Sequence, residues 1–542
     1  MSPLIPLLLL LAGALALLLG LLPRFRHTGP IAVAAALAAL ATLLWMALGL
    51  PVSATLSNWL PAELFRTGLA LNVDGLAWLF ALAVLAATIA ALVTGLARPG
   101  GRRVGNRVAI LLLTLTALMS IFSENVLTRV VAWALLDIIY FLSLLWLAEG
   151  ESLEPQAVLN LTFNAAGTLC AVAAAVLISR TSATLSLRDA ALTPQSTVLM
   201  TLAAIFRLGL FPLHLALPTE VTLRQGVGTL IRLIPAAVAL ETLSRLALFG
   251  FSETVRPWLA VFALAALVVG AFQLWNSADP RHGLIYLVIA QSGVAVLAGL
   301  WGGAQGALAL TVTTLTLIMG GALIYLSSGH DEQRPWPTAL PLVGVAAIGG
   351  LPLTVGFLGV GHLYASLIAA GGWYWLALAV IVLAQSVLVA GLLYAVFWPG
   401  VSLEAEPVTF AAYFGGLSLP AMLLVLTAIF ATLPGSIALM QDLGLLGFSG
   451  LGSAVAALLV VISLAAGYAL WRFDALIRGF AAPLTGLSLA NITRLDWLYA
   501  LVWNVLRSLG SLVDNVGAIL EGEGAILWAL VVGVLAWLLT RQ

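Results

Sequence analysis

Uncharged apolar runs recur along almost the whole of this 542-residue chain and restrict its fold more than any other feature. About sixteen of them have the length, roughly 18–25 residues, that lets a helix cross the ~30 Å hydrocarbon core of a bilayer. Within lipid, backbone polar groups must be bonded inside the segment, so these runs predict helices. We therefore predict an all-α polytopic membrane protein with spans near residues 3–22, 30–50, 73–96, 107–122, 126–148, 156–179, 197–218, 226–249, 256–275, 283–300, 306–327, 339–369, 372–398, 416–433, 449–471 and 525–540.

The scarcity of charge excludes several other classes of protein. Only 8% of the residues are charged, against about 25% in an average soluble domain. The 22 basic residues are balanced by 22 acidic ones, which argues against nucleic acid as a partner. Cys170 is the single cysteine, so a disulfide framework and a cysteine-based metal cluster are excluded. The sequence also lacks a CxxC motif, a haem-ligand pair and a nucleotide-binding loop, so we expect no cofactor and no metal.

The segment 204–218 combines an arginine, a histidine and two prolines inside one apolar run. Pro212 and Pro218 each remove a backbone donor and clash with the preceding turn, so the helix is predicted to break here. Broken helices at membrane depth occur only where they are buried in protein or line a cavity. Arg207 and His214 would lie two turns apart on one face if the helix continued. An arginine inside the membrane is by default a functional-site hypothesis.

A second interruption falls in the run 339–369, where Gly350, Pro352 and Gly356 lie close together. Two interrupted helices at corresponding places in two halves indicate an inverted-repeat transporter fold. The second half offers fewer groups that could carry a proton near neutral pH, because this interrupted span contains one histidine, His362, and no acidic residue or arginine. Two interpretations of His362 remain open, a proton carrier and a histidine satisfied at a helix interface.

Ionisable residues inside the predicted spans are few and lie mainly in the first half. They are Arg129, Asp137, Arg207, His214, Arg232, Glu241 and Arg245. A carboxylate in lipid needs a partner, and we expect Arg207 to be the counter-ion of Asp137, with a bond to a neighbouring hydroxyl as the alternative. Glu241 precedes Arg245 by four residues, which fits a structural ion pair as well as a functional one.

Every basic residue of this chain is an arginine, which does not release its proton. If protons cross the first half, they must therefore move by water and by the remaining titratable groups. In that case Asp137 and Arg207 would form the first gate, His214 the onward relay and Glu241 the exit or link.

The placement of arginines in the loops predicts the orientation of the chain. Arg24 and Arg26 follow the first span, and four more arginines lie between 98 and 107. Short loops rich in arginine face the cytoplasm, so we expect the N-terminus outside, in a bacterial inner membrane. The alternative for the first run is a signal peptide, but no small-residue cleavage site follows it. The connection 51–72 then becomes an external loop packed on the bundle.

Beyond residue 472 the pattern of polar residues changes. Between 493 and 521 they recur every three or four positions, which is typical of an amphipathic helix along a membrane surface or against other helices. Such a helix would either bind a neighbouring subunit or only connect two parts of the chain along the membrane interface. The predicted organisation is: 1–106, N-terminal helices and external loop; 107–250, first repeat; 251–400, second repeat; 401–471, additional helices; 472–524, amphipathic lateral helix segment; 525–542, final anchor.

Several motifs together resemble the antiporter-like membrane subunits of complex I, membrane-bound hydrogenases and multi-subunit sodium/proton antiporters. The segment 207–218 resembles the broken seventh helix of this family, and 350–357 is similar to the broken twelfth. The segment 279–293 resembles the tenth helix, and 73–75 the start of the third. The resemblance covers roughly residues 60–400, and the late amphipathic segment looks like the lateral helix of the longest members.

The departures from the family pattern concern the proton path. The resemblance implies a chain of one glutamate and several lysines, but Ala134 falls at the glutamate position, one turn before Asp137. Arg207 replaces the first lysine, and Arg232 lies where a histidine is common. Gly321 and Val360 occupy second-half positions usually held by lysine.

Three functional hypotheses follow from the resemblance. The first is a membrane subunit of a complex-I-like assembly, which translocates protons, or supports their translocation, while partner subunits transfer electrons. The second is a degenerate scaffold that no longer pumps and holds its partner subunits together. The third is the transporter half of an inorganic-carbon uptake complex. In each case the expected partners are other membrane subunits and the lipid bilayer.

Overall fold

The computed structural model describes residues 2–19, 28–56, 67–97, 104–147, 153–181, 185–187, 192–217, 225–277, 279, 283–327, 336–399, 406–432 and 451–474, with four single positions beyond 500. The chain divides into two compact units, Met1–Asp474 and Ala475–Gln542. Almost all of the second unit, including the predicted lateral helix and final span, lies outside the described residues.

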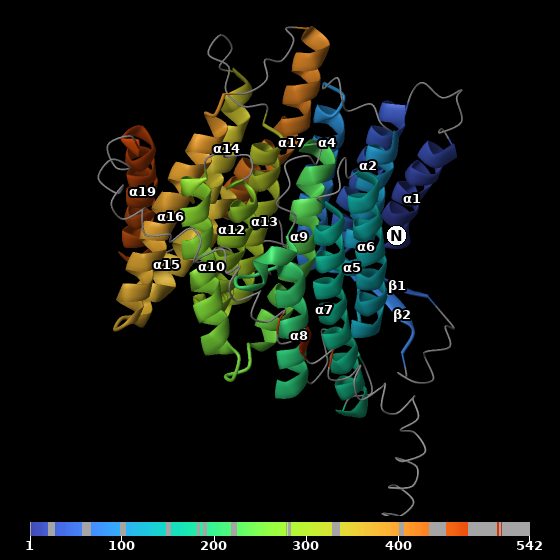
Figure 1. Cartoon of the computed structure of the whole chain (residues 1–542), viewed down its shortest axis with the longest axis horizontal. Coiled ribbons are helices and arrows are strands. Elements are labelled where there is room, and N and C mark those ends of the chain that lie inside the picture. The colour runs from blue at the N-terminus through green and yellow to red at the C-terminus, as the bar shows by residue number, and fades with distance from the viewer. Residues whose placement is uncertain are drawn as a thin grey trace, which may run out of the picture. The chain divides into compact units, whose positions relative to one another are not determined.

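The first unit is a bundle of membrane-length helices (Figure 1). Eleven helices in its described part are long and apolar enough to cross a membrane. The helical elements are α1 Leu4–Leu19, α2 Thr28–Met46, η1 Ala47–Gly49, α4 Gly75–Thr94, α5 Val104–Ile121, α6 Val126–Leu147, α7 Leu153–Thr181, α8 Pro194–Leu208, η2 Leu213–Ala216, α9 Gln225–Phe249, α10 Arg256–Asn276, α12 Ile285–Trp301, η3 Gly303–Gln305, α13 Gly306–Tyr325, η4 Trp336–Thr338, α14 Ala339–Ile348, α15 Val355–Ala370, α16 Tyr374–Val396, α17 Pro407–Thr432 and α19 Leu451–Arg472.

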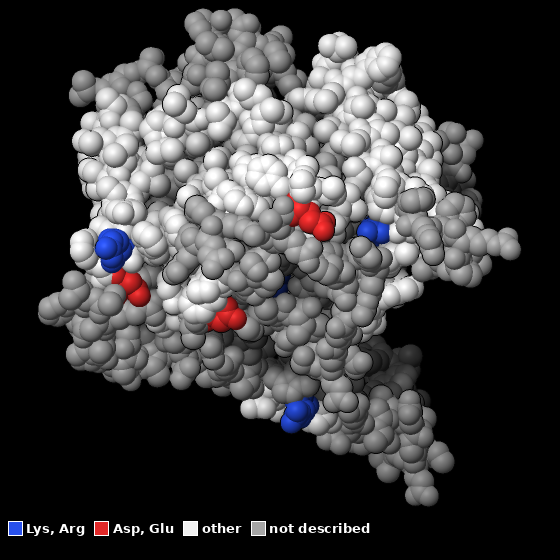
Figure 2. Space-filling model, turned by 90° about the horizontal axis from the view of Figure 1, so that it is seen from above, with Lys and Arg blue, Asp and Glu red and all other residues white. Residues whose placement is uncertain are grey.

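Burial separates central from peripheral helices. The apolar windows of α9 and α13 are 94% buried and that of α4 is 89% buried, whereas that of α7 is only 33% buried. Apolar side chains on peripheral helices, such as Trp146 and Leu169, are largely exposed, as expected where a helix faces lipid. The described surface seen in Figure 2 carries only a few charged side chains. The chain is an integral membrane protein whose buried polar groups gather around the central helices.

A short β hairpin replaces the loop predicted over residues 51–72. Strands β1 (Val52–Leu56) and β2 (Leu69–Val73) pair antiparallel. Backbone hydrogen bonds continue from Asn72 to Phe122 and from Val126 to Leu185, so the hairpin joins the connections before α6 and after α7. Alternating apolar and polar residues indicate a strand, but the alternation is short here, so the sequence favoured a loop.

The first helix break occurs earlier than the prolines predict. Helix α8 ends at Leu208, and Gly209 adopts φ +61° with its amide bonded to the carbonyl of Ile205. A left-handed residue at this position is the usual glycine terminator of a helix. The predicted break is therefore present within 204–218, but α8 ends at Leu208 instead of at a proline, and Pro212 lies in the turn before η2. Pro218 lies outside the described residues.

The second break is present where it was predicted. Helix α14 ends at Ile348 and α15 begins at Val355. Gly350 has φ +80°, a conformation that side chains with a Cβ rarely adopt. A Cβ on Gly356 would lie 1.7 Å from the carbonyl oxygen of Ala347, so glycine lets the start of α15 rest directly on the end of α14. Pro352 lies in the connecting turn.

Candidate functional site

Asp137 and Arg207 form a bidentate ion pair between α6 and α8. Arg207 Nη1 donates to Asp137 Oδ1 at 2.6 Å, and Nη2 donates to Oδ2 at 2.9 Å. The side chains are only 1% and 6% exposed. The predicted pairing is therefore confirmed, and its planar geometry is the one that a guanidinium favours with a carboxylate.

Two neighbours hold this ion pair in place. The hydroxyl of Thr168 on α7 donates to Asp137 Oδ2 and accepts from Arg207 Nη2, each at 3.2 Å. The ring of Trp133 lies 4.5 Å from the Arg207 guanidinium carbon, and its indole N–H donates to Ser120. The hydroxyl contact that was the alternative for Asp137 is thus present together with the ion pair.

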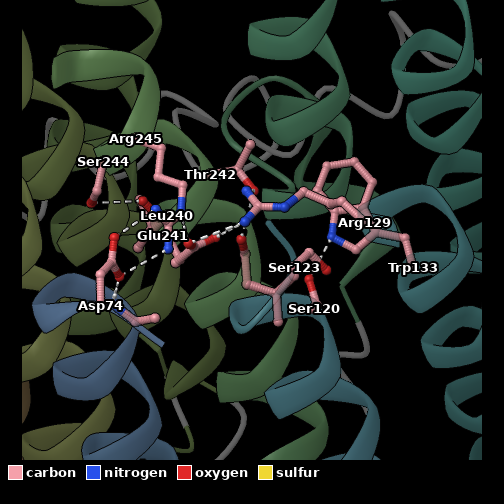
Figure 3. Close-up of polar contacts among 12 residues, drawn as sticks. Asp74, Ser120, Ser123, Arg129, Trp133, Leu240, Glu241, Thr242, Ser244 and Arg245 are labelled. Carbon is pink, nitrogen blue, oxygen red and sulfur yellow. Dashed lines mark hydrogen bonds and ion pairs between the residues drawn. The ribbon is translucent and has the colours of Figure 1, made fainter. Parts of the chain in front are cut away.

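A second ion cluster lies at the start of α6 (Figure 3). Arg129 Nη2 donates to Glu241 Oε1 at 3.1 Å and lies 2.9 Å from Oε2, while Nη1 donates to Thr242. Arg245 bonds the same Glu241 through Nε, which confirms the predicted pair. Its two terminal nitrogens donate to Asp74 at 3.1 and 3.3 Å. Figure 3 shows Glu241 between the two arginines, with Asp74 beyond Arg245.

This second cluster has equal numbers of acidic and basic groups, which is what deep burial requires. The side chains of Arg129 and Glu241 are fully buried, and that of Arg245 is 4% exposed. Asp74 is the most exposed member, at 25%. It also accepts from the amide of Ala77 and so caps α4. The cluster, defined as Asp74, Arg129, Glu241 and Arg245, fastens α4, α6 and α9 together.

Three other predicted site residues, His214, Arg232 and His362, have contacts of their own. His214 stacks on Phe211 and its Nδ1 is 3.2 Å from the Pro212 carbonyl oxygen, so it does not share a helix face with Arg207. Arg232 lies over the ring of Tyr325, 5.6 Å from its centroid. His362 Nε2 lies 2.9 Å from the Gly302 carbonyl oxygen, an interface contact. Their roles in proton transfer remain predictions.

Sequence reasoning missed Asp74 and did not pair Arg129. Asp74 precedes a long apolar run, which reads as an ordinary helix cap. Arg129 was noted within a span, but its partner Glu241 is 112 residues away. Charge balance was the available signal, because a buried arginine without a neighbouring acid in its own span must find one on another helix.

The fold is similar to that of membrane subunits in multi-subunit complexes of known structure. The chain superposes on a chain of the Mrp complex from Dietzia sp. with a TM-score of 0.81, at 20% identity, covering 99% of this chain and 62% of that one. It matches a chain of the archaeal membrane-bound sulfane sulfur reductase with a TM-score of 0.74, at 16% identity, covering 99% and 100% of the two chains. A chain of respiratory complex I from Thermus thermophilus gives 0.62 at 21% identity, covering 78% and 98%.

The sequence relatives are named as subunits of NADH-ubiquinone or NADH-quinone oxidoreductases. The chain is 29% identical over 182 residues to NADH-ubiquinone oxidoreductase chain 2 of Thoopterus nigrescens, which is 31% of this chain and 50% of the relative. It is 27% identical over 203 residues to NADH-quinone oxidoreductase subunit N of Acidithiobacillus ferrooxidans, or 33% and 41% of the two chains. The matches therefore span half or less of these relatives, and no family model matches the sequence.

Proposed function

We propose that this chain is a membrane subunit of a complex-I-like energy-converting assembly that moves protons as its partner subunits transfer electrons. The observation that carries the proposal is the Asp137–Arg207 ion pair, buried beside a broken helix. Ionisable residues buried within a membrane are by default a functional-site hypothesis, with ion pathways among the functions that they mark. The names of the relatives, subunits of NADH-quinone and NADH-ubiquinone oxidoreductases, support the coupling to electron transfer.

In this proposal Asp137 is the group that binds and releases the proton. Arg207 stays positively charged at all relevant pH values, so it stabilises the ionised carboxylate and cannot itself deliver a proton. Protonation of Asp137 removes the attraction between the two side chains and frees Arg207 to move. Thr168 contacts both side chains and keeps the carboxylate in position when the ion pair opens.

The remaining predicted path residues extend this route. His214 lies on η2, beyond the break at Gly209, and is the next titratable side chain along that element. Arg232 on α9 would stabilise an anion or a water chain without carrying the proton. Glu241 is a second carboxylate that can accept a proton, and His362 is the candidate acceptor in the second half.

A second function, a scaffold without proton transfer, is favoured by the composition of the second half. Among the described residues of α12–α15, none is Asp, Glu or Arg, and His362 is the one histidine. The threonines at 311, 313, 314 and 316 all donate to backbone carbonyls one turn back. The described part of α12–α15 therefore offers few groups that could carry a proton over a long distance.

Purification of the native complex separates these functions from inorganic-carbon uptake. We expect co-purifying membrane subunits together with subunits that carry electron-transfer centres. Reconstituted in vesicles, the complex should acidify or alkalinise the lumen when its electron donor is supplied. A complex that contains a soluble zinc protein and no redox centre would instead support inorganic-carbon uptake.

Residues 493–521 are the segment that we propose to contact a neighbouring subunit.

Site-directed labelling tests the proposed bacterial inner membrane location, with the N-terminus outside. With Cys170 replaced by alanine, a cysteine at exposed Ser53 in the hairpin should react with a membrane-impermeant maleimide added to intact spheroplasts. A cysteine at Arg102 should react only after the membrane is permeabilised, because arginine-rich loops face the cytoplasm. The opposite labelling pattern would reverse the proposed orientation.

A further inference from the structure

One face of α6 carries both ion clusters of the first half. Arg129, Trp133 and Asp137 follow one another at intervals of four residues, which places them in a row along the helix. Arg129 belongs to the cluster with Glu241, and Asp137 to the pair with Arg207. Eight residues of helix separate the two arginine–carboxylate contacts by about 12 Å along the helix axis.

The cluster around Glu241 leads from this row toward the surface on the hairpin side. Asp74 follows β2 directly and caps α4, and its side chain is 25% exposed. Arg245 bonds both Asp74 and Glu241, so it links the accessible carboxylate to the buried one. The route thus begins at a side chain that water reaches and ends at one that is fully buried.

Unpartnered polar atoms lie along the same face of α6. The Nε atoms of Arg129 and Arg207 and the hydroxyl of Tyr140 are buried and have no hydrogen-bond partner within the described protein. A buried donor without a partner costs roughly 1–3 kcal/mol, so such sites in native proteins bind ordered water. Tyr140 follows Asp137 by three residues on this helix. These polar atoms belong to the two ion pairs and to Tyr140, and a water molecule that enters beside either carboxylate can bond them.

Trp133 lies between the two clusters and blocks this row. It is fully buried, it stacks on the guanidinium of Arg207, and its N–H is held by Ser120. The indole ring offers no proton-accepting atom, because its nitrogen only donates. A continuous chain of water between Arg129 and Asp137 thus requires the Trp133 ring to move.

We propose that Asp74, Glu241 and Asp137 form a proton route from the hairpin face to the ion pair at the helix break, with Trp133 as its gate. This inference rests on the proposed function. It adds the face from which the proton enters and the side chain that must move to let it pass. A proton from the aqueous phase binds Asp74, passes through water to Glu241, and reaches Asp137 when the ring of Trp133 moves aside. Arg129, Arg207 and Arg245 remain charged throughout and stabilise each carboxylate while it is ionised.

The sharpest variant is Asp74→Asn, because asparagine caps a helix as well as aspartate does but binds no proton. The substitution also removes one negative charge from the balanced cluster, so proton movement is normalised to the amount of assembled complex. We expect the assembled variant to lose most of its donor-driven proton movement in vesicles loaded with a pH-sensitive dye. The matched control is Glu253→Gln, which removes an 89% exposed carboxylate outside the route and should pump like wild type. Normal pumping by Asp74→Asn would overturn the proposed route.

A double variant tests the buried part of the route. Arg129→Gln with Glu241→Gln removes both charges of the fully buried pair at once, which avoids leaving one of them without a counter-ion. We expect the double variant to assemble and to lose donor-driven proton movement. If it pumps normally while Asp137→Asn does not, the cluster only fastens helices and the inference fails, whereas the proposed function stands. If Asp137→Asn also pumps normally, the proposed function itself fails.

Passive proton leak through Trp133 variants tests the role of this residue as the gate. Trp133→Ala should increase passive proton leak several-fold in vesicles under a potassium diffusion potential, and Trp133→Phe, which keeps an aromatic ring there, should not. Adding Asp74→Asn to Trp133→Ala should suppress the leak. A leak that persists in this combined variant would show that protons bypass the route.

Discussion

Asp137→Asn is expected to abolish donor-driven proton movement by the reconstituted complex. Asparagine keeps the size of the side chain but can neither hold a negative charge nor bind a proton. Arg207 would then be a buried cation without its anion, and removing one member of a buried ion pair costs about 3–5 kcal/mol. The measurement is the luminal pH change in vesicles when the complex turns over, normalised to the amount of assembled complex.

Loss of stability and loss of the proton site can be separated by a second variant. Asp137→Asn combined with Arg207→Gln leaves no unpaired charge and should restore assembly relative to the single variant. It should still move no protons, because the carboxylate is missing. An unchanged pH gradient in an assembled Asp137→Asn complex would exclude this carboxylate from the path.

Gly356→Ala is expected to have the largest effect on stability. The added Cβ would lie 1.7 Å from the carbonyl oxygen of Ala347, so α14 and α15 must move apart at the break. Overpacking of this kind costs about 1–3 kcal/mol or more, and here the clash is with backbone, which cannot rotate away. The expected result is a lower midpoint of thermal unfolding and less assembled complex after heating in detergent.

The matched control for this glycine is Gly415→Ala in α17. No atom lies within 4 Å of the Cβ that it would add. Alanine is the better helix former by about 1 kcal/mol, so this variant should be neutral or slightly stabilising. Equal destabilisation by both substitutions would contradict the close approach of α14 and α15 that the structure shows.

The helices of this protein could be predicted from its sequence because apolar length is a local property. Helices such as α4, α9 and α16 begin and end within three residues of the expected spans. The break at Gly350 was predicted for the same reason, since glycine and proline act on their own backbone. The end of α8 was missed because Gly209 adopts a left-handed conformation before either proline is reached. The left-handed conformation of Gly209 also depends on packing, because a Cβ at this position would lie 2.9 Å from Cγ of Leu217 across the turn.

The candidate site could be predicted only in part, because its contacts join distant helices. The Asp137–Arg207 pair was predictable, since ionisable residues are rare in lipid and each of the two needs a partner of opposite charge. The cluster of Asp74 with Arg245 spans 171 residues, and Asp74 looks like an ordinary helix cap in the sequence. Trp133 has no sequence signal at all, because its position between two charge clusters follows from which side chains of α8 and α9 reach α6. Contacts of this kind appear only when the bundle is assembled.

Infrared difference spectroscopy of the complex during turnover tests the central claim most directly, namely that Asp137 binds and releases a proton. We predict a protonated carboxyl band that forms and decays with turnover in wild type and is missing from the assembled Asp137→Asn, Arg207→Gln variant. If wild type pumps protons with the same carboxyl bands as this double variant, Asp137 stays ionised throughout, and the account is contradicted.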